Sequence, residues 1–311
     1  MVRSVRGVSD KIAFTVGTSR NPQKYADSAK ELGVDLAESY DAVLRDPSVD
    51  AVVLATPHSL HREQIEAAAA AGKHVFCEKP LTLNRTDSEA ACEAARRHGV
   101  VLAAGHNRRF HPAFVTLRDS VARGRLGNIL HLEASMTSPG FWRYEAESWR
   151  MERDESPAGG MAAMGVHLID AMISMVGRVR SVFAQSDRIH RRDGLDDMTS
   201  ALLRFESGVT GYLGTSLSTE WCFDVRVFGD DGWAAVRNLD MSEYNFRPRV
   251  GEAEDFHFEP FDTERAELEA FADAVAGRAR YPVSLDEVVH STEVLQAVVE
   301  SAASGNKVTL G

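Results

Sequence analysis

Val75-Phe76-Cys77-Glu78-Lys79-Pro80 predicts a strand that ends in a turn, and the predicted fold extends outward from this stretch. The proline after Lys79 restricts that lysine to extended or turn geometry. In open α/β sheets, ligands bind just beyond the carboxyl ends of the strands, so Lys79 is a candidate site residue. A solvated Lys-Pro turn explains these six residues equally well, and the structural context must decide between the two.

Strand-like and helix-like segments alternate on both sides of this stretch. Residues 12–18, 51–55, 74–77 and 100–104 are predicted strands, and residues 21–32, 60–71 and 86–98 are predicted helices. Gly33, Gly72 and Gly99 follow the helices as stop residues, and Thr86 with Glu89 fits a capping box. The alternation is typical of βαβ units. We therefore expect a doubly wound parallel (Rossmann) sheet over residues 1–108.

Polar residues gather in the loops that follow the predicted strands. In chain order, these loops hold Ser19 and Arg20, then Thr56, Pro57, His58 and His61, then Glu78 and Lys79, and last residues 105–110. The carboxyl ends of parallel strands meet at one edge of a sheet, where ligands bind. Each residue alone could be an ordinary surface side chain, but their shared position favours a binding site.

Composition excludes several classes of protein. The formal net charge of −11 argues against a general nucleic-acid binder, which needs a basic footprint. The three cysteines are odd in number and lack a CxxC pair, so a disulfide framework or a structural zinc site is not expected. The sequence shows no secretory leader and no apolar run of about 18 residues. We expect a cytoplasmic protein.

The hydrophobic period changes after residue 108. Residues 129–135, 179–186, 198–205, 209–217 and 223–228 are strand-like, and Ser207-Gly208 fits a tight hairpin between two of them. Helical stripes follow near the end, with Leu268, Phe271 and Leu295 among their core positions. These patterns predict an α+β domain over residues 109–311, built on a large, mostly antiparallel sheet.

One segment of this second domain carries candidate chemistry. It contains Trp149-Arg150 and then a helix that begins near Gly159-Gly160 and holds His167 and Asp170. These last two residues stand at i and i+3, so they are neighbours on the helix surface. A histidine satisfied by Asp170 is the plain structural interpretation. No third ligand stands at helical spacing, so we expect no metal site.

Three segments together resemble a known family. They are residues 55–61 (Ala-Thr-Pro-His-Ser-Leu-His), residues 71–81 (Ala-Gly-Lys-His-Val-Phe-Cys-Glu-Lys-Pro-Leu) and residues 105–110 (Gly-His-Asn-Arg-Arg-Phe). Their order and spacing resemble the Gfo/Idh/MocA oxidoreductases, the family of glucose–fructose oxidoreductase and inositol dehydrogenase. The resemblance extends to the last predicted helix.

The resemblance implies an NAD(P)-dependent oxidoreductase that acts on a secondary alcohol or carbonyl of a sugar, polyol or related compound. It implies Lys79 and His167 as the catalytic residues. The cofactor-binding candidates are Ser19, Arg20, Thr56, Pro57, His58, His61, Glu78, Lys79 and Asn107, and the substrate-binding candidates are Arg109, Trp149, Arg150, His167 and Asp170. The family also implies a homodimer or homotetramer formed through the antiparallel sheet.

The roles of the two catalytic candidates depend on their pKa values. Histidine has the ordinary pKa closest to that of a general base, which favours His167. Lys79 could act as base only if burial and nearby cations depress its pKa; otherwise its charge would stabilise an alkoxide. Many family members carry an Asp where this chain has Ala163, so His167 would act with Lys79 alone.

The sequence lacks one element that family members share. No GxGxxG loop, which would bind the cofactor pyrophosphate, occurs in the chain. We therefore expect an N-terminally truncated Rossmann domain: either the start lies too late in the reading frame or the element is truly absent. The missing loop favours an alternative function, a non-catalytic NAD(P)- or sugar-binding sensor. Ser19-Arg20 offers no carboxylate to the ribose, which favours NADP over NAD.

Overall fold

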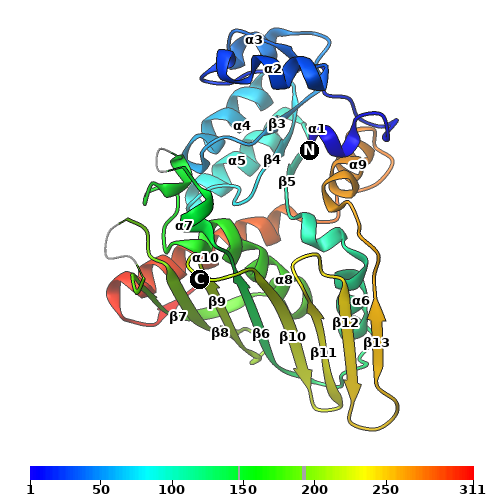
Figure 1. The fold of residues 1–311 in the computed structure, drawn as a ribbon, viewed down its shortest axis with the longest axis vertical. Coiled ribbons are helices and arrows are strands. Elements are labelled where there is room, and N and C mark those ends of the chain that lie inside the picture. The colour runs from blue at the N-terminus through cyan, green and yellow to red at the C-terminus, as the bar shows by residue number, and fades with distance from the viewer. Residues whose placement is uncertain (146–147, 191–193) are drawn as a thin grey trace.

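The computed structural model describes residues 1–145, 148–190 and 194–311. The chain forms two parts, one built on a small parallel sheet and one on a nine-stranded sheet (Figure 1). This is the predicted combination of a Rossmann-like sheet and a large, mostly antiparallel sheet. The predicted boundary between residues 108 and 109 stays a prediction, because the closing segment contributes Val283 and Val288 to the core of the first part.

The parallel sheet consists of β3 (Ala51–Leu54), β4 (His74–Cys77) and β5 (Leu102–Ala104), in that order. The connections are η1 (His58–Leu60) with α4 (His61–Ala70), and then α5 (Arg85–His98). Each connection returns the chain to the start of the next strand, so the strands run parallel and their carboxyl ends share one edge. All three strands match the prediction in position.

The first fifty residues differ from the prediction. The expected strand at 12–18 is a strand only over β1 (Val16–Gly17), which pairs with the unpredicted β2 (Asp35–Leu36) in a separate two-stranded sheet. The helices here are α1 (Val2–Val5), α2 (Pro22–Leu32) and α3 (Tyr40–Arg45). Strand β1 forms no ladder with the main sheet, so its apolar residues are only partly buried.

Helix ends follow the local chemistry that the sequence indicated, with one correction. Gly33 and Gly99 adopt the left-handed conformation that ends a helix, with φ of 66° and 67°. The cap of α5 is Asn84, not Thr86, because the Asn84 side chain accepts a hydrogen bond from the backbone N–H of Asp87. The cap therefore lies two residues earlier than the capping box at Thr86 predicted.

The nine-stranded sheet has the order β13-β12-β11-β10-β6-β9-β8-β7-β14, and only the β6–β9 pair is parallel. Its strands are β6 (Ile129–Thr137), β7 (Val179–Asp187), β8 (Met198–Phe205), β9 (Thr210–Ser216), β10 (Cys222–Gly229), β11 (Gly232–Arg237), β12 (Glu243–Pro248), β13 (Glu254–His257) and β14 (Val308–Thr309). The five predicted strands and the hairpin at Gly208 are confirmed. Strands β11 to β14 were not predicted.

Helices cover one face of this sheet (Figure 1). They are α6 (Pro112–Ala122), α8 (Val166–Val176) and α10 (Leu285–Ser304), while α9 (Thr263–Val275) returns to the parallel sheet. Short elements line the junction of the two parts: η2 (Asn107–Phe110), α7 (Gly140–Arg143), η3 (Trp149–Met151) and the π-helical η4 (Met161–Gly165). Leu268, Phe271 and Leu295 are buried, as predicted. In the described part of the chain, every helix is too short or too polar to span a lipid bilayer.

Candidate active site

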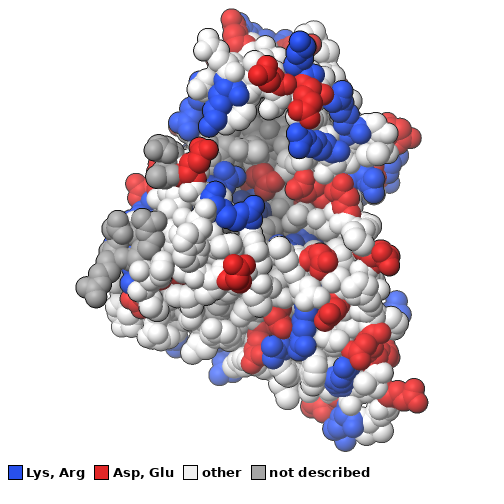
Figure 2. All heavy atoms as spheres, viewed as in Figure 1, with Lys and Arg blue, Asp and Glu red and all other residues white. Residues whose placement is uncertain are grey.

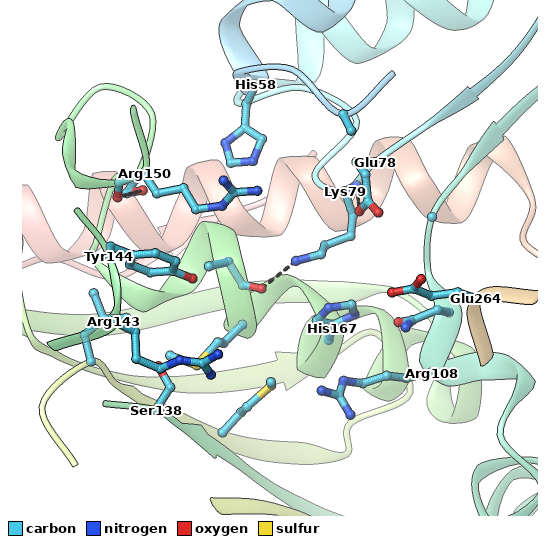
Figure 3. Close-up of a pocket in the computed structure, with 18 of the residues that line it drawn as sticks. His58, Glu78, Lys79, Arg108, Ser138, Arg143, Tyr144, Arg150, His167 and Glu264 are labelled. Atoms are coloured by element: carbon cyan, nitrogen blue, oxygen red, sulfur yellow. Dashed lines mark hydrogen bonds between the residues drawn. The ribbon is translucent and has the colours of Figure 1, made fainter. Parts of the chain in front are cut away.

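A cavity of about 550 Å³ lies between the two parts of the molecule. One wall is formed by residues that follow β3, β4 and β5, and the opposite wall by β6, η4 and α8, with α9 at the side. Figure 3 shows side chains from both walls directed into this space. The charged and polar lining residues are Thr56, His58, Glu78, Lys79, Asn107, Arg108, Ser138, Arg143, Tyr144, Trp149, Arg150, Ser156, His167, Trp221, Glu264 and Glu267.

Lys79 extends into the cavity from the turn after β4. Its Nζ donates a hydrogen bond to the backbone carbonyl of Ala163 at 2.6 Å, which joins the parallel sheet to η4 (Figure 3). Burial lowers the pKa of Lys79 to about 8. The negative charge of Glu78 opposes this lowering, and the positive charges of Arg108 and Arg150 add to it. An amine with this pKa is partly neutral near physiological pH and can accept or donate a proton there.

His167 enters the same cavity from the first turn of α8. The side chain is buried, and its Nδ1 atom has no hydrogen-bond partner among the described residues. Burial, together with the charges of Lys79 and Arg108, holds the pKa of His167 well below its usual 6.5. The structure thus brings the two catalytic candidates together from separate parts of the chain, with His167 as a neutral imidazole.

The cofactor candidates divide into two groups. Thr56, His58, Glu78 and Asn107 line the cavity. Pro57, His61, Ser19 and Arg20 do not line it. Arg20 is exposed beyond β1, and Ser19 accepts a hydrogen bond from the backbone N–H of Asn21.

His61 has a structural role that the sequence did not reveal. It is fully buried, and its ring nitrogens lie 3.1 Å from the carbonyl oxygens of Thr56, Pro80 and Leu81. These contacts tie together the loops after β3 and β4. Its nitrogens are occupied by backbone oxygens and it does not line the cavity, so contact of His61 with the cofactor stays an untested prediction.

Arg109 and Asp170, predicted to bind the substrate, form an ion pair with each other, and their substrate-binding role stays an untested prediction. Both are buried outside the cavity lining, and the Arg109 guanidinium contacts both carboxylate oxygens of Asp170 at 2.7 Å. Glu287 accepts a further hydrogen bond from Arg109 at 3.1 Å. Asp170 consequently does not pair with His167, contrary to the plain structural interpretation of the sequence. The ion pair holds η2 against α8.

Trp149 and Arg150 line the cavity as the sequence predicted. The Trp149 ring contacts the buried His58 edge to face at 4.9 Å, and the Arg150 guanidinium lies 4.3 Å from the centre of the Trp149 ring. His58 Nδ1 lies 2.9 Å from the Glu155 carbonyl oxygen, and burial lowers the pKa of His58 to about 3. This cluster places one arginine over the loop that follows β3.

Several cavity residues escaped the sequence analysis. Arg108 lines the cavity, whereas its neighbour Arg109, which the sequence predicted as a substrate-binding residue, does not. Glu267 is 1% exposed, and burial raises the pKa of its carboxyl well above 4.5. A signal for Glu267 existed, because it lies on the buried helical stripe of Leu268 and Phe271. For Arg108 against Arg109, no sequence pattern decides which one faces the cavity.

A Rossmann-like sheet with a lysine and a neutral histidine in a cavity at its strand ends defines a class of protein, the nucleotide-dependent oxidoreductases. Comparison with family models gives the family. Residues 3–106 match the oxidoreductase family with an NAD-binding Rossmann fold, and residues 114–235 match the GFO/IDH/MocA C-terminal domain. The chain belongs to the GFO/IDH/MocA oxidoreductase family and is an NAD-binding Rossmann oxidoreductase.

Individual relatives agree with this family. The chain is 29% identical to 1,5-anhydro-D-fructose reductase of Ensifer adhaerens, over 98% of this chain and 92% of the relative. It is 32% identical to D-xylose 1-dehydrogenase (NADP(+)) 2 of Haloferax volcanii, over 94% and 90% of the two chains. Among solved structures, levoglucosan dehydrogenase in complex with NADH has the same fold, with a TM-score of 0.86, 22% identity, and 96% and 90% coverage.

The predicted truncation gains no support from these comparisons. The match to the NAD-binding model begins at residue 3, within α1. The sequence still contains no GxGxxG loop.

Proposed function

We propose that this protein catalyses the reversible oxidation of a secondary alcohol on a sugar, polyol or related small molecule. The observation that carries the proposal is the meeting of Lys79 and His167 in one cavity at the carboxyl ends of parallel strands. Relatives named as sugar reductases and dehydrogenases support the substrate class. A non-catalytic sensor would gain nothing from a lysine whose pKa burial lowers to about 8.

The residues present fit the nicotinamide end of a dinucleotide. Buried polar atoms without partners among the described residues face the cavity, including His167 Nδ1 and Glu267 Oε2. Thr56 and Glu78 follow β3 and β4, where a Rossmann-type sheet binds its nucleotide. We assign these two with His58 and Asn107 to the nicotinamide and its ribose, and assign no residue to the pyrophosphate. When bound, the nicotinamide would supply the acceptor or donor of the hydride.

Lys79 transfers the proton in the proposed mechanism. In the oxidation direction, the substrate hydroxyl gives its proton to the neutral Nζ amine, whose position is set by the Ala163 carbonyl. His167 remains a neutral imidazole and orients the same hydroxyl by a hydrogen bond. The sequence favoured His167 as the general base, whereas here Lys79 is the base. The reason is that burial and two nearby cations disfavour the imidazolium form of His167.

Variants of the two residues test this function. Purified protein is assayed with NADH, NADPH and their oxidised forms on a panel of aldoses, ketoses and polyols. We expect Lys79→Met and His167→Ala each to lower kcat by about 100-fold or more, since each removes a group that handles the reacting proton. Lys30→Met and His98→Ala alter exposed helix residues and serve as matched controls. Near-normal turnover in both cavity variants would refute the mechanism.

Preference for NADP over NAD is also proposed. Ser19 and Arg20 follow β1 and present no carboxylate that would repel a 2′-phosphate. The relevant measurement is the ratio of kcat/KM for NADPH and NADH, before and after Arg20→Asp. A ratio that favours NADH in the unmodified protein contradicts the preference.

We propose a homodimer or homotetramer formed through the nine-stranded sheet. The helices cover one face of that sheet, whereas Phe183, Leu202 and Tyr212 lie side by side in register on the other face. Leu202 is 56% exposed there, and an exposed apolar row of this kind is typical of an interface. A cytoplasmic location is proposed from the three unpaired cysteines, and cell fractionation tests it.

A further inference from the structure

Among the residues that the structure describes, three arginines of the cavity have no anionic partner. Arg108, Arg143 and Arg150 line it, and none of their guanidinium groups makes a hydrogen bond or an ion pair with the described residues. Most other arginines of the described chain are paired, as Arg62, Arg85 and Arg247 are. Figure 2 shows basic atoms gathered at the hollow between the two parts of the molecule. Unpaired guanidinium groups in a cavity are candidate ligand groups.

Arg108 is the most enclosed of the three. Its guanidinium lies 4.6 Å from the centre of the Phe223 ring on β10, and its Nε atom is buried without a hydrogen-bond partner. Burial lowers the pKa of Arg108 to about 10, so the side chain stays charged at neutral pH. A buried charge without a partner costs free energy, and a bound anion would recover it.

Arg143 approaches from the other side of the cavity. Its guanidinium lies 5.0 Å from the centre of the Trp221 ring, and Figure 3 shows Arg143 and Arg108 directed toward each other below Lys79 and His167. Ser138 lies beside Arg143 and offers a hydroxyl to the same space. Two forked cations and a hydroxyl on opposite sides of one space suit a group of several anionic oxygens.

The position of this pair separates it from the cofactor. The nucleotide of a Rossmann-type sheet lies against the ends of the parallel strands, which here carry Thr56 and Glu78. Arg108 contacts Phe223 of the nine-stranded sheet, and Arg143 contacts Trp221 at the start of the same hairpin region. These ring contacts place both guanidinium groups beside the nine-stranded sheet, and we take this as the substrate side of Lys79 and His167.

Acidic groups of the cavity lie elsewhere in it. Glu78, Glu264 and Glu267 also line the space. Glu264 is paired with the N-terminal ammonium of Met1 at 2.7 Å, and burial raises the pKa of both Glu78 and Glu267. These carboxylates do not neutralise Arg108 or Arg143, since neither arginine lies within ion-pair distance of one among the described residues. The positive charge of this end of the cavity remains available to a ligand.

We infer that the substrate is an anionic sugar derivative, whose carboxylate or phosphate is held between Arg108 and Arg143. This inference rests on the proposed function, and it narrows the substrate class from sugars in general to sugar acids or sugar phosphates. The anion would fix the sugar ring so that one ring hydroxyl faces Lys79 and His167. A neutral sugar would leave the buried Arg108 guanidinium unpaired, which disfavours its binding.

Matched substrates test the inference. The unmodified protein is assayed with D-glucose, D-glucuronate and D-glucose 6-phosphate, and with D-galactose and D-galacturonate, so that the ring stays constant while the charge changes. We expect kcat/KM for the preferred acid or phosphate to exceed that of its neutral partner by roughly 30-fold, the effect of hydrogen bonds to a charged group. The acid and phosphate arms show which anion is recognised. Equal kcat/KM values within each pair overturn the inference.

Variants and direct binding complete the test. Arg108→Met and Arg143→Met should each reduce the preference for the anionic substrate by about tenfold or more. Arg97→Met, which changes an exposed residue of α5, is the control and should leave that preference unchanged. Binding of acetate and inorganic phosphate is measured by calorimetry in the presence of NADH. If Arg108→Met loses anion binding and Arg97→Met keeps it, the site is supported. If no sugar is turned over in the same experiments, the proposed function is refuted but the anion site is not. Unchanged anion binding in Arg108→Met refutes the site.

Discussion

Residue by residue, the chemistry of the site depends on how each side chain is surrounded. Lys79 contacts a backbone carbonyl instead of a carboxylate, and the negative charge of Glu78 only partly opposes the burial that lowers the pKa of Lys79 to about 8. His167 faces cations and loses its proton more readily than a free histidine. The pair thus divides its tasks: a lysine that titrates near neutrality and an imidazole that stays neutral.

The pH dependence of the rate should report Lys79. For alcohol oxidation, we expect kcat/KM to rise with pH and level off above an apparent pKa near 8, because only the neutral amine accepts the hydroxyl proton. In the reduction direction the protonated amine is the donor, so the rate should fall through the same pH range. Initial rates in both directions, measured with a substrate that does not titrate, provide the check.

The pH profile also distinguishes Lys79 from His167 as the base. His167 should contribute no inflection near its ordinary pKa of 6.5, because its pKa lies well below that value. Arg108→Met should move the inflection to higher pH, since the charge of Arg108 helps to lower the pKa of Lys79. An inflection near 6.5 that disappears in His167→Ala would assign the base to the histidine instead.

Secondary-structure elements position the site through a few buried contacts. The π-helical turn η4 presents the Ala163 carbonyl to Lys79, and α8 then carries His167 into the cavity. One turn further, Asp170 binds Arg109 of η2. The loop that carries Asn107 and Arg108 is therefore held to the same helix that carries His167.

Breaking this ion pair should destabilise the fold. We expect Asp170→Asn to lower the free energy of unfolding by about 3 kcal/mol, because Arg109 would be left as a buried charge with only Glu287 nearby. Denaturant unfolding monitored by circular dichroism measures this loss. Glu93→Gln, which removes an exposed ion pair with Arg96, is the control and should leave the midpoint almost unchanged. A similar midpoint for all three proteins would show that the Arg109 pair is not structural.

At the scale of the whole molecule, the two faces of the nine-stranded sheet have different surroundings. One face packs on α6, α8 and α10 and carries the main core. The other exposes Phe183 and Leu202 beside charged residues of β6 and β10. Burial of this second face between two copies of the chain would complete the layering that a sheet ordinarily needs.

Self-association should depend on that face. Leu202→Glu is expected to weaken dimerisation by about tenfold or more, since it places a charge where apolar surface would be buried. Ile189→Glu, at an exposed apolar residue beyond the end of β7, is the matched control. Light scattering across a concentration series measures both. If the unmodified chain is a monomer, or if Leu202→Glu associates as the unmodified chain does, the sheet is not the interface.

Local patterns predicted the elements better than the site. The apolar runs at β3, β4 and β5 and the glycines that end the helices were sufficient to place these elements. Strand burial and the left-handed conformation of a glycine each depend on only a few neighbouring residues. The length of β1 was predicted too long: the strand has two residues, and its partner β2 lies outside the main sheet. Strands β11 to β13 were missed because their outward positions carry mixed polar and aromatic residues, such as Trp233 and Asn245.

By itself, the sequence determined the two-part architecture, because periodicity and turn chemistry are local properties of the chain. Its resemblance to the family, not its periodicity, indicated the lysine and histidine that both line the cavity. Only the tertiary structure decided the orientation of adjacent residues: Arg108 faces the cavity and Arg109 the ion pair, and His61 binds backbone oxygens. It also showed that burial lowers the pKa of His167 well below 6.5 and that of Lys79 to about 8. Those properties arise from burial and from charges that lie far apart in the sequence, which no local pattern records.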